Sequence, residues 1–310
     1  MQLKNIIYCF SLLAILNIIS SCEDVVEVDL EAGDNQLVVD AWITNQEGPQ
    51  TIRLVRTSPY FDSSASPAET GATVAVVSES GTVYEFKDDD NDGSYIWEST
   101  DGSTFGQVGE SYTLGIETAD NIVYTSFSRM NRIMPIDSIV TEDREEELGS
   151  PAGIYAEVYA RDFVGEGDAY WIKTFKNGQF LNKPSEMNIA YDASFTPGGN
   201  ADGIAFITPI RAGINRQADS VDGAEDDNDL PPWAIGDSIR VEIHSLTNES
   251  YFFLVGARTQ MTLGDATLFA EPPSNIPSNI IYVGEGEPAP RDKAVGFFNV
   301  AAVSELGRTL

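Results

Sequence analysis

The sequence predicts a mainly β protein, with an immunoglobulin-like or transthyretin-like β-sandwich followed by a second β-rich domain that carries one α-helix. Three observations predict this fold class. Short β-branched and aromatic stretches recur along the chain, turn residues separate them about every 8 to 12 positions, and one stretch alone has convincing helical spacing. The hydrophobic fraction of 42% is ordinary for a globular protein.

The first domain is expected over residues 36–132 and contains seven short strands. Several of these stretches alternate apolar and polar side chains, as strands do when one face lies on a core. The acidic turn Asp88–Gly93 is expected to join two of them as a hairpin, and Met130–Pro135 is expected to connect to the second domain. The predicted strands cover residues 37–43, 51–57, 73–77, 82–86, 95–97, 112–116 and 122–127.

The second domain is expected over residues 133–310. Thr247-Asn248 provides a cap for a helix over Glu249–Gln260, in which Tyr251 and Leu254 recur at helical spacing. A long polar, acidic loop is expected over residues 219–232. The predicted strands of this domain cover residues 136–140, 154–160, 169–175, 202–209, 238–243 and 294–300.

Residues 1–21 have the features of a cleaved secretion signal. The apolar run Ile6–Ile19 is shorter than the roughly 20 residues that a membrane-spanning helix needs. Ser20-Ser21 precede Cys22, as in the bacterial lipobox. We therefore expect the Cys22 thiol to carry the lipid and residues 22–35 to form a lipidated tether.

The charge balance restricts the partners of the protein. The chain has 49 acidic and 18 basic residues, which gives a formal net charge of −31. This charge excludes nucleic acid as a partner, and it repels an anionic lipid surface, so the lipid must provide the attachment. The pair Glu23-Asp24 resembles the export signal that sends Bacteroidetes lipoproteins to the outer face of the outer membrane. We therefore expect a lipid-anchored protein that faces the cell surface.

Several short motifs follow one another in order over nearly the whole chain. They are Leu37–Ala41, Asp92–Tyr95, Gly109–Leu114, Met134–Ile139, Gly236–Ile239, Phe269–Asn275 with Ser278-Asn279, and Gly296–Phe298. Together they resemble the Bacteroidetes outer-membrane lipoproteins known as domain of unknown function 4249. The resemblance implies a surface lipoprotein, often encoded beside a TonB-dependent receptor of the starch-utilisation type. It implies no reaction.

The acidic turn has two interpretations. Asp88, Asp90, Asp92 and Gly93 match the first half of a calcium loop, in which alternate acidic side chains point one way and glycine permits the bend. The closing bidentate glutamate is missing, because its position holds Ser99. The turn is therefore either a Ca²⁺ site or a hairpin turn without a metal, for which the same residue types are suited.

A second acidic segment contains Asp226, Asp227 and Asp229, followed by Pro231-Pro232 and Trp233. This loop either is solvated or wraps a cation, and we expect it to offer a contact for a ligand or partner. Trp233 is expected to be its exposed anchor, because a tryptophan outside any strand can present its ring to a ligand. The other three tryptophans lie in predicted strands and are expected in the core; they are Trp42, Trp97 and Trp171.

No catalytic residue is expected. His244 is the only histidine, and no Gly-x-Ser-x-Gly elbow surrounds a serine that could act with it. We expect a non-enzymatic accessory binding subunit that helps a TonB-dependent receptor to take up a nutrient. Two alternatives stay open: a surface hydrolase acting on glycans or peptides, since a glycosidase needs only two carboxylates, and a structural or adhesive surface protein.

Overall fold

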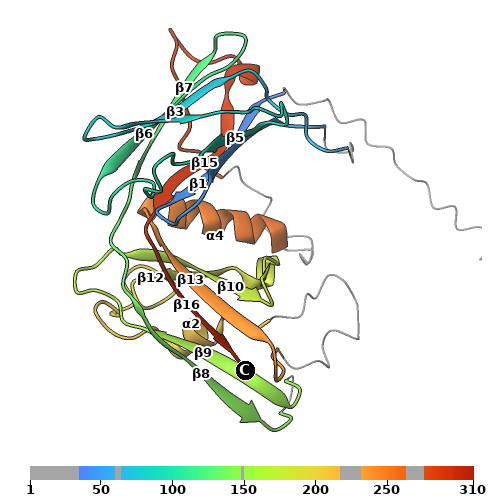
Figure 1. The fold of residues 1–310 in the computed structure, drawn as a ribbon, viewed down its shortest axis with the longest axis vertical. Coiled ribbons are helices and arrows are strands. Elements are labelled where there is room, and N and C mark those ends of the chain that lie inside the picture. The colour runs from blue at the N-terminus through green and yellow to red at the C-terminus, as the bar shows by residue number, and fades with distance from the viewer. Residues whose placement is uncertain (1–34, 60–63, 148–149, 217–231, 263–275) are drawn as a thin grey trace, which may run out of the picture. The chain divides into compact units, whose positions relative to one another are not determined.

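The computed structural model describes residues 35–59, 64–147, 150–216, 232–262 and 276–310 (Figure 1). Residues 34–310 form one compact unit, which is mainly β and confirms the predicted fold class. The predicted signal peptide and Cys22 lie outside the described residues. Of the helices in the described ranges, none has the length and apolar character that crossing a membrane requires.

Two sheets form the sandwich. Its strands are β1 (Leu37–Thr44), β2 (Gln50–Arg56), β3 (Thr73–Ser78), β4 (Val83–Phe86), β5 (Ser94–Trp97), β6 (Ser111–Glu117), β7 (Val123–Arg129), β14 (Ile281–Tyr282) and β15 (Ala294–Ala301). One sheet has the order β15-β1-β2-β5 and the other the order β14-β7-β6-β3-β4. The seven strands predicted for this part of the chain are therefore all present.

Side-chain alternation determines which face of β1 enters the core. Leu37, Val39, Ala41 and Ile43 are fully buried, and they lie at every second position. Successive side chains of a strand point to opposite faces, so Trp42 lies on the outer face of the sheet. The first sheet thus has an apolar inner face, and on its outer face Trp42 packs against a separate hydrophobic cluster that includes Tyr251 and Leu254 of helix α4 (Asn248–Thr262).

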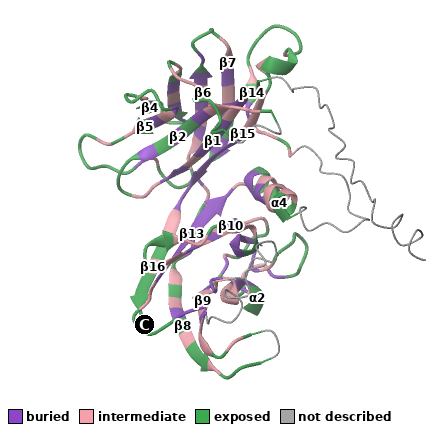
Figure 2. Ribbon diagram, turned by 90° about the vertical axis from the view of Figure 1, so that its right-hand side faces the viewer, coloured by how far each residue is buried: buried purple, intermediate pink, exposed green. Residues whose placement is uncertain are grey.

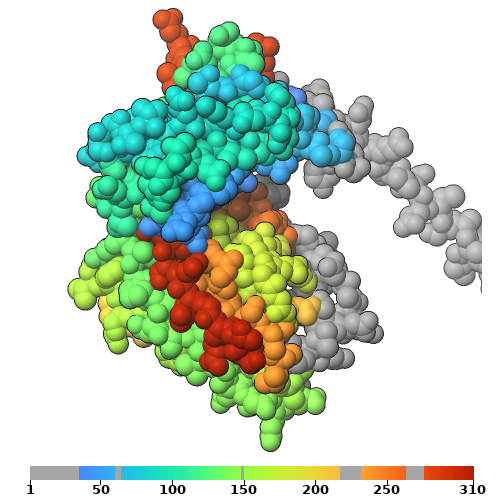
Figure 3. Space-filling model, in the orientation of Figure 1, coloured from blue at the N-terminus to red at the C-terminus, as the bar shows by residue number. Residues whose placement is uncertain are grey.

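The end of the chain completes the sandwich. β15 pairs in parallel with β1, and β14 pairs with β7. The blue and red segments meet accordingly on the surface in Figure 3. Because strands from both sides of residues 132 and 133 share these sheets, the predicted domain boundary at that point stays a prediction.

The predicted hairpin around Asp88–Gly93 is wrong. β4 pairs with β3 in one sheet and β5 pairs with β2 in the other, and a single bridge between Lys87 and Ile96 joins the two segments. The turn therefore carries the chain from one sheet to the other. Tyr84 and Trp97 pack edge to face across this crossing, with ring centroids 5.2 Å apart, so aromatic packing between the sheets replaces a ladder of hydrogen bonds.

The second β-rich part contains a five-stranded sheet and a separate two-stranded ribbon. Its elements are β8 (Ile136–Arg144), β9 (Gly153–Ala160), β10 (Ala169–Lys176), β11 (Gln179–Phe180), β12 (Asn188–Tyr191), β13 (Ser238–Leu246), β16 (Val303–Thr309), the helices α2 (Thr208–Ala212) and α4 (Asn248–Thr262), and the 3-10 turns η1 (Pro184–Glu186) and η3 (Pro290–Asp292). The sheet has the order β11-β10-β13-β16, with β12 also paired to β10, and the ribbon consists of β8 and β9. Figure 2 shows that β13 is mostly buried, whereas β8 is intermediate or exposed except at Ile139.

Helix α4 confirms the predicted helix. The Thr247 hydroxyl accepts a hydrogen bond from the Ser250 amide at 3.2 Å, as an N-cap does. Both ribbon views place α4 between the sandwich and the second sheet, where it contacts β10, β12, β13 and β15 (Figures 1 and 2). The strand predicted over residues 202–209 is wrong: residues 208–212 form α2, and Pro209 occupies its first turn, where its missing N–H costs no hydrogen bond.

Candidate functional site

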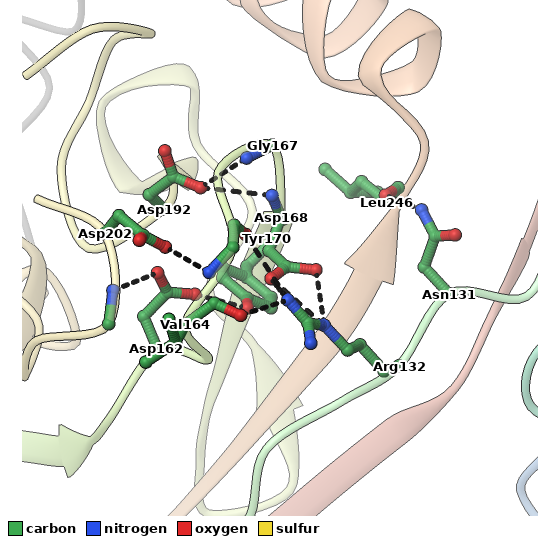
Figure 4. Close-up of polar contacts among 12 residues, drawn as sticks. Asn131, Arg132, Asp162, Val164, Gly167, Asp168, Tyr170, Asp192, Asp202 and Leu246 are labelled. Atoms are coloured by element: carbon green, nitrogen blue, oxygen red, sulfur yellow. Dashed lines mark hydrogen bonds and ion pairs between the residues drawn. The ribbon is translucent and has the colours of Figure 1, made fainter.

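Three carboxylates converge in the second β-rich part. Asp162, Asp192 and Asp202 each offer an oxygen, and these oxygens all lie within 4.8 Å of one another (Figure 4). Asp162 and Asp192 are buried, with 3% and 6% of their surface exposed, and Asp202 is half-buried. We call these three residues the acidic cluster.

Strand pairing brings the acidic cluster together. Asp162 lies two residues after the end of β9, and Asp192 directly follows β12. Because β12 runs antiparallel to β10, its last residue pairs with Ala169 at the start of β10. Asp192 therefore lies beside the loop between β9 and β10, and its backbone has the left-handed φ of 50° that aspartate tolerates better than most residues.

Backbone amides hold the carboxylates in place. Asp192 Oδ1 accepts hydrogen bonds from the amides of Gly167 at 2.8 Å and Asp168 at 3.1 Å. Asp202 Oδ1 accepts from the Gly165 amide at 2.8 Å. The loop between β9 and β10 thus directs three N–H groups at two carboxylates, which fixes the loop to the neighbouring segments.

Asp162 has different partners. The Tyr170 hydroxyl donates to its Oδ1 at 2.6 Å and the Gly203 amide to its Oδ2 at 3.1 Å. Burial raises the pKa of the Asp162 carboxyl, these two hydrogen bonds oppose the rise, and the negative charges of Asp168 and Asp192 add to it. Protons and cations are therefore both favoured by the local negative potential.

Arg132 closes the site on its other side (Figure 4). Its guanidinium forms a bidentate ion pair with Asp168, with Nη2 and Oδ2 2.5 Å apart, and Nη2 also donates to the carbonyl oxygens of Val164 and Gly165. The same group lies 4.6 Å from the centroid of the Phe163 ring. Arg132 belongs to the predicted connector, so this contact fixes the β9–β10 loop to the segment that leads out of the sandwich.

The acidic cluster has the donor chemistry of a hard-cation site. It offers carboxylate oxygens only, which are the ligands that Ca²⁺ and Mg²⁺ prefer in proteins. Oxygens around a Ca²⁺ ion lie at about 2.3–2.6 Å from the metal, so two ligands lie at most about 5 Å apart, which the spacing here satisfies. The hydrogen bonds to the loop amides also explain the cluster without a cation.

The structure does not join the acidic turn to this cluster. The Asp88 carboxylate accepts hydrogen bonds from the amides of Asp92 and Gly93, both at 3.1 Å, and Asp92 Oδ1 accepts from the Ser94 amide at 2.8 Å. These contacts satisfy the turn itself. A Ca²⁺ site formed by Asp88, Asp90 and Asp92 stays a prediction.

The prediction that Trp233 is exposed is wrong. Its side chain is fully buried, and its indole Nε1 donates to Asn215 Oδ1 at 3.0 Å. Asn215 also accepts from the Ala156 amide at 2.8 Å and donates to the carbonyl oxygens of Ala156 and Ala212. A buried indole with a satisfied N–H belongs to the core, so Trp233 is not available to a ligand. Asp226, Asp227 and Asp229 lie outside the described residues.

The only histidine is engaged within the fold. His244 is 4% exposed, and its Nε2 lies 2.8 Å from Glu242 Oε2. Burial holds the pKa of His244 well below its usual value, and the nearby cations Lys173 and Arg240 lower it further. Within the described residues, no serine hydroxyl hydrogen bonds to its ring.

Sequence reasoning did not find Asp162, Asp192, Asp202 or Arg132. The three carboxylates are spread over 41 positions, from residue 162 to residue 202, and they follow no motif. One signal was available, because acidic residues flank the predicted strands on either side of residues 161–168. The short strand β12, which places Asp192 beside them, was not predicted.

Comparison with known proteins establishes the family. The model of the family described as domain of unknown function DUF4249 matches residues 23–306. The chain belongs to this family. Its match begins directly after Cys22 and includes the acidic cluster, Arg132 and both sheets of the sandwich. No curated protein matches the chain.

One solved structure with some similarity is a segment of two fibronectin type III domains from chicken tenascin. It is 16% identical, the alignment covers 70% of this chain and 92% of that one, and the TM-score is 0.20. A score this low carries no argument about function. The β-sandwich is established by the strand pairing described above.

Proposed function

We propose that this chain is a non-enzymatic lipoprotein on the outer face of a bacterial outer membrane, where it serves as an accessory binding subunit of a TonB-dependent uptake system. The observation that carries the proposal is the apolar run Ile6–Ile19 with Ser20-Ser21-Cys22 directly before the start of the family match at residue 23. A lipid on Cys22 would hold the folded part at the membrane surface.

The folded part supports a binding role in preference to catalysis. Its only histidine is buried against Glu242 and forms no hydrogen bond with a serine hydroxyl among the described residues. The outer face of the first sheet carries Trp42, and aromatic side chains on a sheet face are suited to bind ligands or partners. The association with a receptor rests on the resemblance of the sequence motifs.

The membrane anchor can be tested by cell fractionation with a matched variant. The wild-type chain should appear in the outer-membrane fraction and be degraded when protease is added to intact cells. Cys22→Ser removes the acceptor thiol and blocks the acylation that precedes signal cleavage, so the variant should be absent from the outer-membrane fraction. Wild-type protein that stays in the soluble fraction, or that resists protease until the cells are lysed, would contradict a surface-anchored lipoprotein.

The receptor association can be tested by affinity purification from mild-detergent extracts of the native outer membrane. A TonB-dependent receptor should be recovered in a stoichiometric amount with the tagged wild-type chain. A known receptor complex of the same membrane, purified in parallel, shows whether the extraction preserves such assemblies. Recovery of the lipoprotein alone from an extract that preserves the control complex would overturn the accessory role.

A further inference from the structure

A group of aromatic side chains lies where the outer face of the first sheet meets the second sheet. Trp42 of β1 and Trp171 of β10 pack edge to face, with ring centroids 5.5 Å apart. Phe253 of α4 and Phe297 of β15 pack against Trp42 at 6.3 Å and 5.9 Å. Trp42, Trp171 and Phe253 are only half-buried. The surface in Figure 3 is hollowed between the blue strand β1 and the yellow-green strand β10, with α4 behind.

A lysine lies within this aromatic surface. Lys173 shares a face of β10 with Trp171, and its Nζ lies 4.1 Å from the Trp171 ring centroid and 5.7 Å from that of Phe180. In the described part of the chain, Nζ forms no hydrogen bond and no ion pair. Burial lowers the pKa of Lys173 to about 8, and the negative charge of Asp40 opposes this effect. The group therefore stays mostly protonated at neutral pH.

The nearest acidic groups do not neutralise this ammonium directly. Asp40 is exposed, and it also faces the positive charge of Arg53. Glu242 is the cross-strand partner of Lys173, but its carboxylate is engaged by His244 at 2.8 Å and by Arg240. Lys173 therefore interacts electrostatically with Asp40 of the first sheet and His244 of β13, and Glu242 is its cross-strand partner. Arg53 and Arg240 act in turn on Asp40 and on His244.

Another lysine on the same strand shows the ordinary arrangement. Lys176 pairs with Asp237 at 3.0 Å, and its Nζ donates to the Pro232 carbonyl oxygen at 3.0 Å. In a chain with 49 acidic and 18 basic residues, partners for a lysine are abundant. An ammonium held between aromatic rings without such a partner leaves hydrogen-bonding capacity that a ligand can use.

We propose that Lys173, Trp171 and Phe180 bind a small organic anion. Its carboxylate, sulfonate or phosphate group accepts a hydrogen bond from Lys173 Nζ, and its aromatic or apolar body packs on the two rings. The combination of one charged donor with apolar walls is typical of small-molecule sites. This proposal gives a ligand class for the binding role proposed above. Anion binding itself is argued from the contacts of Lys173, and only its use in nutrient uptake rests on the proposed function.

Two fluorescent probes of the same shape test the proposal. 8-Anilinonaphthalene-1-sulfonate carries an anionic group, whereas N-phenyl-1-naphthylamine is the same aromatic body without it. The protein is the mature chain, residues 22–310, with Cys22→Ser; it lacks both the apolar signal and the lipid and contains the whole compact unit, so it needs no detergent. Lys173→Met should weaken binding of the sulfonate about 10- to 100-fold, the range expected for a charged hydrogen bond, and should change binding of the neutral probe less than about twofold.

Further variants separate charge from structure. Lys173→Arg should restore sulfonate binding. Asp40→Asn should strengthen it at pH 6, where Lys173 keeps its proton, because a competing negative charge is removed. The matched control Lys176→Met alters an ion-paired lysine and should leave binding unchanged. In the chain with Lys173 intact, sulfonate affinity should fall as the pH rises through about 8. In Lys173→Arg it should stay constant, since arginine keeps its charge.

Several results would overturn the proposal: no sulfonate binding to the chain with Lys173 intact, equal loss of both probes in Lys173→Met, or equal loss in Lys176→Met. The titration uses the isolated chain, so its failure leaves receptor association untouched. A failed receptor purification, in turn, leaves anion binding untouched.

Discussion

Lys173→Met is expected to stabilise the protein at neutral pH. Burial holds the pKa of Lys173 at about 8 instead of 10.5, so the native state disfavours the charged form. A difference of 2.5 in pKa corresponds to about 3 kcal/mol, because each unit is worth about 1.4 kcal/mol. The aromatic contacts and partial solvation offset some of this penalty, so we expect the free energy of unfolding to rise by about 1–3 kcal/mol. Methionine keeps the unbranched apolar stem that packs on Trp171.

The pH dependence of stability tests independently whether Lys173→Met stabilises or destabilises the protein. Below pH 8 the native and unfolded states both hold the proton, and the penalty is fully present. Between about pH 8 and 10.5 the unfolded state binds more protons than the native state, so this group makes wild-type stability rise with pH. Urea unfolding followed by tryptophan fluorescence at pH 7 and pH 10 should show the advantage of Lys173→Met at pH 7 and its decline at pH 10. A variant that is less stable than wild type at pH 7 would refute the reasoning, and Lys176→Met, which removes an ion pair, should not be stabilised.

Three further perturbations test the fold. Between pH 6.5 and 5, the unfolded state gains a proton on His244 while the native state keeps it neutral, so acidification destabilises the wild type. His244→Gln should reduce this loss by up to about 1.4 kcal/mol per pH unit. If the urea midpoint of both proteins falls equally with decreasing pH, the reasoning is contradicted. Asn215→Ala leaves the Ala156 amide and carbonyl and the Trp233 indole N–H without this hydrogen-bond partner, and it should lower the free energy of unfolding by about 3 kcal/mol. A loss below about 1 kcal/mol in urea unfolding would show that water replaces the side-chain amide. Gly296→Ala should lower the free energy of unfolding by about 2 kcal/mol or more, because the φ of Gly296 is 95° and the new methyl group overlaps the Val39 carbonyl. The control Gly286→Ala, with a φ of 81° and no atom within 4 Å, should lower it by about 1 kcal/mol. Equal losses in thermal unfolding would rule out the overlap as the cause.

The sequence predicted the strands better than their partners. The alternation of β1 and the cap at Thr247 are local signals, and both elements are where they were expected. Pairing across the chain is not a local property. The parallel pair of β1 and β15 joins residues more than 250 positions apart, so no short turn in the sequence indicates that these two strands pair. Short strands such as β12 and β14 carry too few residues to show a period.

The tryptophans show where local context misled the prediction. Trp233 follows two prolines in an acidic segment, which favours an exposed loop, yet Asn215 satisfies its N–H in the core. Trp42 and Trp171 lie in strands, which favours the core, and both are half-buried and pack against a hydrophobic cluster that contains Leu246, Tyr251 and Leu254. The alternation of β1 places Trp42 on the opposite face from Leu37, Val39, Ala41 and Ile43, so Trp42 packs outside the core of the sandwich.

The parallel pairing of β1 with β15 has a consequence for how the chain acquires its structure. A chain still being synthesised presents β1 long before β15 exists, so one edge of the first sheet stays open until residue 301 is available. An open edge with unpaired N–H and C=O groups can recruit strands from other molecules. Newly synthesised chains therefore pass through a stage in which they are prone to aggregate, and a chaperone that protects this edge would raise the yield of folded protein.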